Sequence, residues 1–177
     1  MNSQYESQFV ERLFDKMSAS YSKMNYISSF GFSERWRKKC VKEIDFTKSK
    51  IVVDLLTGMG ECWKYIDREV NKDATIIGLD FSKEMIKQAK NNALKFKQRK
   101  IEVLKENVFE NSIKTNSADV IISGFGLKTF NEKQLIKLGE EVKNAKNIEV
   151  IFKDLNFEVE YVEYFFGCAS GIKGYKK

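Results

Sequence analysis

Residues 50–61 read KIVVDLLTGMGE, a short apolar run rich in β-branched residues that is followed by glycines at positions 58 and 60. Such a run, bounded by glycine, is typical of a buried strand that ends in a tight turn. Apolar residues follow at helical spacing, namely Trp63, Ile66 and Val70. The stretch therefore predicts a strand, a glycine turn and a helix.

The same unit recurs along the chain. Ala74 to Leu79 predicts a second strand that ends in Asp80, and Ser82 is expected to cap a helix that continues to about Phe96. Residues 101–104 and 118–123 predict a third and a fourth strand. Strands that alternate with helices indicate an α/β fold, a Rossmann-like parallel sheet with helices on both faces and right-handed crossovers.

The two flanks of this core have other patterns. Apolar residues from Val10 to Met24 recur at steps of three and four, which predicts an N-terminal helical segment, and Ser33 is expected to cap a second helix that ends near Asp45. At the other end, residues 157–166 and 168–175 predict an antiparallel hairpin at the edge of the sheet. We expect an N-terminal helical cap segment, residues 1–45, over the site of a core formed by residues 46–177.

The composition limits the chemistry. With 177 residues, of which 42% are hydrophobic and 32% charged, the chain has the size of one soluble folded domain. The net charge of +6 favours anionic partners. Histidine is absent, which excludes Ser-His-Asp triads and imidazole metal sites. Three scattered cysteines and no long apolar run predict a cytoplasmic protein without a disulfide framework, a zinc motif or a membrane span.

Four segments follow the predicted strands and converge on one edge of the sheet, where open parallel sheets bind ligands. The glycine turn, residues 58–60, is compatible with cofactor binding and equally with a purely steric need for glycine. Asp80, 26 residues after Asp54, suits ribose hydroxyls, although this spacing does not distinguish NAD from S-adenosylmethionine. Asn107 and Val108 follow the third strand, where they can read an adenine edge or form an ordinary turn, and Gly124 follows the fourth strand.

Several stretches resemble the ubiquinone/menaquinone biosynthesis C-methyltransferases. Residues 14–41, FDKMSASYSKMNYISSFGFSERWRKKCV, are similar to the N-terminal signature of that family, and VVDLLTGMGE resembles its glycine motif. GLDFSKEMIKQAK, residues 78–90, resembles its second strand, and SGFGLKTF, residues 123–130, its fourth-strand motif. The ending, residues 155–177, is similar to its C-terminal hairpin.

The resemblance implies S-adenosyl-L-methionine as cofactor and methylation of a ring carbon of a prenylated demethylmenaquinone or ubiquinone-precursor hydroquinone. The residues that it implies for cofactor binding are Asp54, Gly58, Met59, Gly60, Asp80, Phe81, Asn107, Val108 and Gly124. Because histidine is absent, the candidates for the substrate side are the polar residues Tyr21, Asn25 and Arg35 of the N-terminal segment, together with Lys128. No general base is identified. Nucleic acid is not expected as a partner, whereas a homo-oligomer and peripheral contact with the inner face of the membrane are left open.

The chain also departs from the family. Leu56 stands where methyltransferases usually have the first glycine of their motif, and Lys128-Thr129 stands where the family has Arg-Asn. Lysine cannot make the planar bidentate contact of arginine. Family members are commonly about 50 residues longer, with a fifth strand and a substrate-covering segment whose place here is near residues 143–147.

Apolar residues from 135 to 155 keep helical spacing, and taken alone the segment between the fourth strand and the hairpin predicts one helix of about 24 residues, or roughly 36 Å. We expect instead a chain break between Lys143 and Asn147, where a segment of a longer natural protein is missing. If the segment is truly lost, the alternative function is a non-catalytic S-adenosylmethionine-binding or scaffold subunit of a quinone-biosynthesis assembly. A basic RNA methyltransferase ranks third, because no patch of interleaved Arg and aromatic residues occurs.

Overall fold

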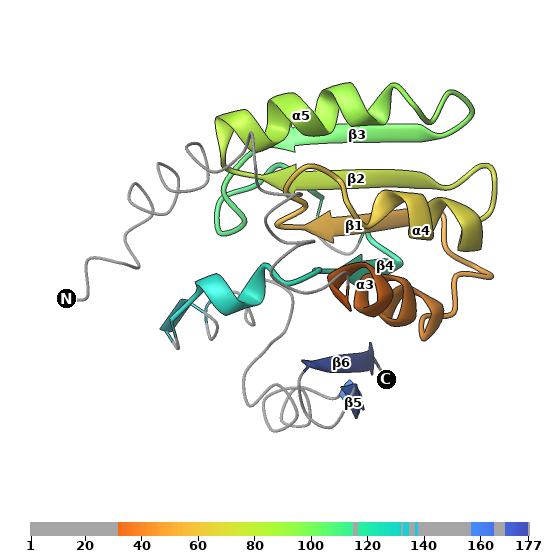
Figure 1. Ribbon diagram of the computed structural model, residues 1–177, viewed down its shortest axis with the longest axis vertical. Helices are drawn as coiled ribbons and strands as arrows, with labels where there is room; N and C mark the ends of the chain where they lie inside the picture. The colour runs from red at the N-terminus through yellow and green to blue at the C-terminus, as the bar shows by residue number, and fades with distance from the viewer. Residues whose placement is uncertain are drawn as a thin grey trace. The chain divides into compact units, whose positions relative to one another are not determined.

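A computed structural model describes residues 32–114, 117–131, 133–134, 137, 157–164 and 169–176 (Figure 1). The chain divides into two compact units, Met1–Thr129 and Phe130–Lys177. The boundary expected after residue 45 stays a prediction. The expected N-terminal helix from Val10 to Met24 lies outside the described residues. The expected chain break between Lys143 and Asn147 also lies outside them, since Lys137 is the one described residue between 135 and 155.

The first unit contains a four-stranded sheet in which every pair is parallel. Its strands are β1 (Ile51–Leu55), β2 (Thr75–Asp80), β3 (Lys100–Lys105) and β4 (Val120–Ile122), in the order β3-β2-β1-β4. Strand β1 begins with three β-branched apolar residues and is buried from residue 52 to residue 55, as is usual for a parallel strand inside a sheet. The parallel Rossmann-like sheet predicted from the sequence is confirmed.

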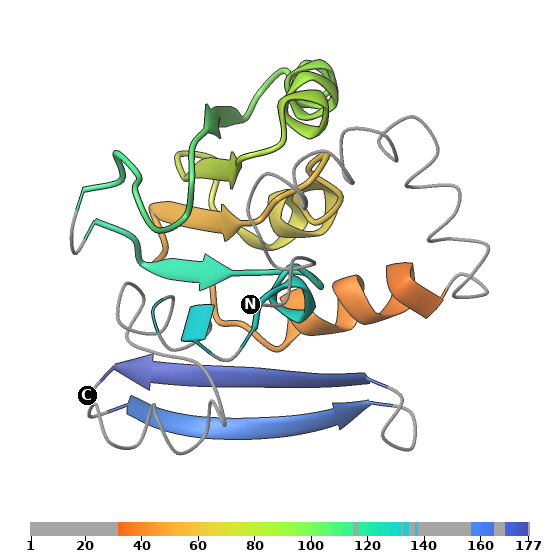
Figure 2. The ribbon, with the colours of Figure 1, turned by 90° about the vertical axis from the view of Figure 1, so that its left-hand side faces the viewer.

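Helices α4 (Trp63–Glu69) and α5 (Lys83–Ala93) cover one face of the sheet (Figure 2). The connections from β1 to β2 and from β2 to β3 progress in the same direction along the sheet, so crossovers of the same hand place both helices on the same side. Ser82 caps α5 as predicted, since its hydroxyl accepts a hydrogen bond of 3.3 Å from the backbone N–H of Met85. A short 3₁₀ helix, η2 (Leu127–Thr129), follows β4.

Helix α3 (Phe32–Lys42) packs against α4. The predicted N-cap at Ser33 is wrong, because α3 already includes Phe32. Ser33, Arg37 and Val41 are the buried residues of this helix. They recur every four residues, so Ser33 belongs to the face that packs and not to the cap.

The core of the first unit is organised around Trp63, which is fully buried. A Cβ atom at Gly60 would lie 2.4 Å from the Trp63 ring, and one at Gly78 would lie 2.5 Å from it. Gly60 also has a φ of +80°, a conformation that favours glycine. Two glycines from different elements therefore make the space that the indole ring occupies.

In the second unit, β5 (Phe157–Tyr164) pairs antiparallel with β6 (Ala169–Lys176), forming a sheet of their own. Glu160 lies opposite Lys173 in the register. The expected position of this hairpin at the edge of the parallel sheet stays a prediction.

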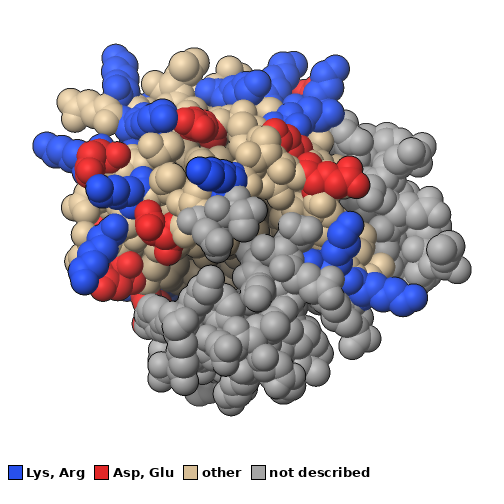
Figure 3. All heavy atoms as spheres, turned by 180° about the vertical axis from the view of Figure 1, so that it is seen from behind, with Lys and Arg blue, Asp and Glu red and all other residues tan. Residues whose placement is uncertain are grey.

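Charges of both signs are interleaved on the described part of the surface seen in Figure 3. The net charge is therefore not gathered into one basic patch on that face. No helix of the described part of the chain has the length and apolarity that crossing a membrane requires.

We predict that Gly78→Ala lowers the free energy of unfolding by about 1–3 kcal/mol, because the new methyl group would overlap the Trp63 ring. Chemical denaturation measures the effect. The matched control is Leu94→Ala, where the side chain is 76% exposed and a change of about 0.5 kcal/mol or less is expected. Equal stability of the Gly78→Ala variant and the native sequence would contradict this packing.

Candidate functional site

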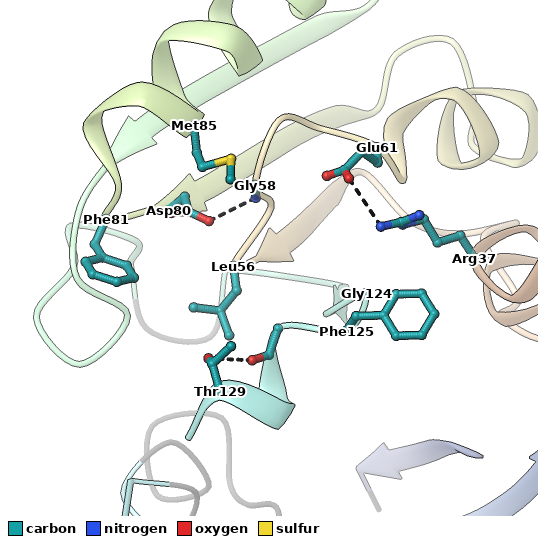
Figure 4. Close-up of a pocket in the computed structure, with 11 residues that line it drawn as sticks. Arg37, Leu56, Gly58, Glu61, Asp80, Phe81, Met85, Gly124, Phe125 and Thr129 are labelled. Carbon is teal, nitrogen blue, oxygen red and sulfur yellow. Dashed lines mark hydrogen bonds and ion pairs between the residues drawn. The ribbon is translucent and has the colours of Figure 1, made fainter. Parts of the chain in front are cut away.

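A pocket opens at the carboxyl ends of β1, β2 and β4 (Figure 4). It encloses about 480 Å³, including space that is open to solvent. Its lining comes from α3, the loop after β1, the end of β2, the start of α5 and the segment after β4.

Asp80 lies at the end of β2 and lines this pocket. Its Oδ2 accepts a hydrogen bond of 2.9 Å from the backbone N–H of Gly58, and its Oδ1 accepts one of 3.0 Å from the backbone N–H of Ser82. The two bonds fix the orientation of the carboxylate. Each carboxylate oxygen has two lone pairs, so the group can also accept hydrogen bonds from a ligand.

The backbone of the loop after β1 has an unusual conformation. Leu56 and Gly58 have φ angles of 56° and 57°. Such angles cost a leucine roughly 1 kcal/mol or more and cost glycine almost nothing. A Cβ atom at Gly126 would lie 2.5 Å from the Cβ atom of Leu56. Leu56 therefore occupies the space that a side chain at position 126 would need, and it lines the pocket (Figure 4).

Asp54 belongs to β1, directly before the glycine loop, and is almost fully buried. Its Oδ2 accepts a hydrogen bond of 2.5 Å from the Thr57 hydroxyl, which ties the glycine loop to β1. Burial raises the pKa of Asp54 to about 7, and the hydrogen bond from Thr57 opposes this shift. Asp54 thus stabilises the conformation of the glycine loop through Thr57.

Arg37 and Glu61 line another part of the pocket. Arg37 Nη2 lies 3.2 Å from Glu61 Oε1, and its Nη1 lies 3.4 Å from Glu34 Oε1. The guanidinium carbon of Arg37 lies 5.1 Å from the centre of the Phe125 ring. The Arg37 side chain is only 5% exposed, so α3 contributes a buried cation to the site.

The sequence analysis did not select Arg37 as a site residue. The signal that identifies it is the four-residue step between Ser33 and Val41, which places Arg37 on the buried face of α3. Arg35, predicted for the substrate side, is exposed, and its guanidinium carbon lies 5.6 Å from the centre of the Phe32 ring. It does not line the described pocket.

The structure brings four of the predicted cofactor-binding residues together, since Gly58, Asp80, Phe81 and Gly124 all line the pocket. Asp54 is not part of the lining, but it accepts the hydrogen bond from Thr57 in the loop after β1.

The other four predicted residues are not part of the described pocket lining. The Met59 carbonyl accepts a hydrogen bond from Asn92, and Gly60 makes room for Trp63. Asn107 closes a turn by accepting a hydrogen bond from the N–H of Phe109, and Val108 is buried. Tyr21 and Asn25 lie outside the described residues, as does the side chain of Lys128, whose backbone belongs to η2.

The sequence model of the ubiE/COQ5 methyltransferase family matches residues 1–141. The chain belongs to this family. Among its relatives, a demethylmenaquinone methyltransferase of Listeria monocytogenes serotype 4a is 30% identical over 119 residues, which cover 67% of this chain and 50% of that protein. The one of Lactococcus lactis is 32% identical over 119 residues, covering 67% and 47%. The chain thus spans about half the length of these relatives.

Solved structures support the fold. A SAM-dependent methyltransferase from Aquifex aeolicus superposes with a TM-score of 0.59 at 21% identity, covering 72% of this chain and 82% of that one. Magnesium protoporphyrin IX methyltransferase (ChlM) from Synechocystis PCC 6803, solved with bound SAM, gives a TM-score of 0.61 at 12% identity, covering 86% and 81%.

We predict that Asp54 makes the stability depend on pH. The carboxyl loses its proton near its ordinary pKa of 3.8 when the chain is unfolded and near 7 when it is folded. Between these values the folded state binds more protons, so the free energy of unfolding falls as the pH rises from about 4 to about 7. Asp54→Asn cannot titrate and should remove a fall on the order of 2 kcal/mol between pH 5 and pH 8.

Urea unfolding at the two pH values measures this difference. Asp119→Asn is the control. Hydrogen bonds from the backbone N–H groups of Ile51 and Lys50 lower the pKa of Asp119 from 3.8, so its contribution changes only below the tested range. An Asp54→Asn variant with the pH dependence of the native sequence would refute the account of Asp54.

Proposed function

We propose that the pocket binds S-adenosyl-L-methionine and that the protein transfers a methyl group to a ring carbon of a demethylmenaquinone-type hydroquinone. The observation that carries the cofactor assignment is the contact between Asp80 and Gly58, which joins an acidic side chain and a glycine turn at the carboxyl end of neighbouring parallel strands. Membership of a methyltransferase family supports S-adenosylmethionine over NAD.

The residues present fit this cofactor. Asp80 offers two fixed carboxylate oxygens, which suit the two hydroxyls of a ribose. Gly58 has no side chain, so a ligand can approach the backbone of the loop closely. Phe81 and Met85 supply apolar surface beside Asp80, as a purine ring requires (Figure 4).

When bound, S-adenosylmethionine supplies a methyl group that its sulfonium already makes electrophilic. The protein must then hold the ring carbon in line with that methyl group at about 3–3.5 Å and exclude water. A hydroquinone hydroxyl has a pKa of about 10, so it keeps its proton near neutral pH. Loss of that proton makes the ring carbon nucleophilic, so a proton acceptor would assist the transfer. We assign the substrate side to Tyr21, Asn25, Arg35 and Lys128, as the sequence motifs suggest.

The second candidate is a non-catalytic subunit that binds S-adenosylmethionine, the alternative that the sequence analysis left open. The two candidates share the cofactor site and differ in turnover, so binding and activity have to be measured separately.

We predict that Asp80→Ala weakens S-adenosylmethionine binding about 10- to 100-fold, the scale of hydrogen bonds to a charged group. Calorimetry measures the dissociation constants. Asp119→Ala is the matched control, because Asp119 also accepts two backbone hydrogen bonds, from Lys50 and Ile51, but at the amino end of β1. It should lower stability and leave affinity unchanged. Equal affinity of Asp80→Ala and the native sequence would remove Asp80 from the site.

We also predict that the protein methylates a reduced demethylmenaquinone with a short prenyl tail, at a ring carbon. Mass spectrometry of the quinone product detects the added methyl group, and a reaction without S-adenosylmethionine is the control. Cofactor binding without any methylated product would favour the non-catalytic candidate. Binding of NAD in place of S-adenosylmethionine would exclude both.

A further inference from the structure

Arg37 and Glu61 form an ion pair on the side of the pocket away from Phe81 (Figure 4). Their side chains are 5% and 16% exposed, so both charges are largely withdrawn from water. A buried ion pair is weak evidence of stability, because the cost of removing two charges from water can exceed their attraction. An ion pair that also lines a ligand pocket calls for an explanation in terms of the ligand.

The guanidinium has donors to spare. It carries five N–H bonds, and among the described residues one on Nη1 points to Glu34 and one on Nη2 points to Glu61. These contacts are 3.4 and 3.2 Å long, whereas charge-assisted hydrogen bonds are usually about 2.7–2.9 Å. The Phe125 ring, 5.1 Å away, holds the plane of the guanidinium without using a donor.

Glu61 is the anionic half of the pair. Its Oε1 accepts the contact from Arg37, and its Oε2 accepts a long hydrogen bond of 3.4 Å from the backbone N–H of Met59. A Cβ atom at Gly58 would lie 3.0 Å from Oε2, so Glu61 folds back toward the turn that contacts Asp80. Burial raises the pKa of Glu61, and a cation beside it would favour the charged form.

We infer that Arg37 and Glu61 bind the α-amino-acid end of the cofactor, with the carboxylate at Arg37 and the ammonium group at Glu61. This inference rests on the proposed function, which supplies a ligand with a nucleoside at one end and a zwitterion at the other. A cation and an anion side by side are complementary to a carboxylate and an ammonium group on one carbon atom. The Asp80 side of the pocket then holds the nucleoside.

Calorimetry with two ligands tests the assignment. S-Adenosylhomocysteine carries the amino-acid end, and 5′-methylthioadenosine has the same nucleoside and sulfur without it. For the native sequence we expect the first to bind at least about tenfold more tightly. Arg37→Met should remove most of this preference and leave the affinity for 5′-methylthioadenosine within about twofold.

Arg99→Met is the matched control, because the Arg99 side chain is 6% exposed and pairs with Asp67 outside the pocket. It should leave the preference intact. Glu61→Gln retains the shape of the side chain and should also reduce the preference, which keeps the test decisive if Arg37→Met does not fold. The inference would be overturned, and the proposed function left standing, if the preference for S-adenosylhomocysteine survived both pocket substitutions. The same holds if both ligands lost affinity equally. Failure of the native sequence to bind either ligand would overturn the proposed function with it.

Discussion

The packing of the Trp63 ring against two glycines is the constraint on which the rest of the first unit depends. Trp63 is fully buried, and Cβ atoms at Gly60 and Gly78 would lie 2.4 and 2.5 Å from its ring. Gly60 belongs to the loop after β1, and Gly78 belongs to β2, so the ring sets how closely α4 approaches the sheet. The position of the glycine loop, and with it the pocket, follows from this contact.

The pocket lies where the chain changes direction across the sheet. From β1 it progresses to β2 and β3 on one side, and it then crosses to β4 on the other side of β1. Such a reversal leaves a crevice beyond the carboxyl ends of the strands. Two carboxylates stabilise the loop after β1 through hydrogen bonds. Asp54 accepts one from the Thr57 hydroxyl, and Asp80 accepts one from the backbone N–H of Gly58. Arg37 brings the opposite charge from α3, which precedes the sheet in the sequence.

Local patterns predicted what depends on local interactions. The β-branched run of β1, the N-cap Ser82 and the acidic end of β2 are each recognisable within a few residues, because strand burial, capping and turn chemistry act over that range. The role of Arg37 was not recognisable from local patterns, because this side chain is buried by packing of α3 against α4 and pairs with Glu61, 24 residues away. The positive φ of Leu56 was not predicted either. Leu56 lies close to Gly126, which follows another strand, and local patterns do not report such a contact.

A crystal structure with bound S-adenosylhomocysteine tests the central claim, that this pocket is a nucleoside-cofactor site, most directly. We expect the ribose hydroxyls within hydrogen-bonding distance of the Asp80 carboxylate, with Gly58 against the ligand and no side chain between them. A ligand bound elsewhere, or one in this pocket with its ribose away from Asp80, would contradict the account.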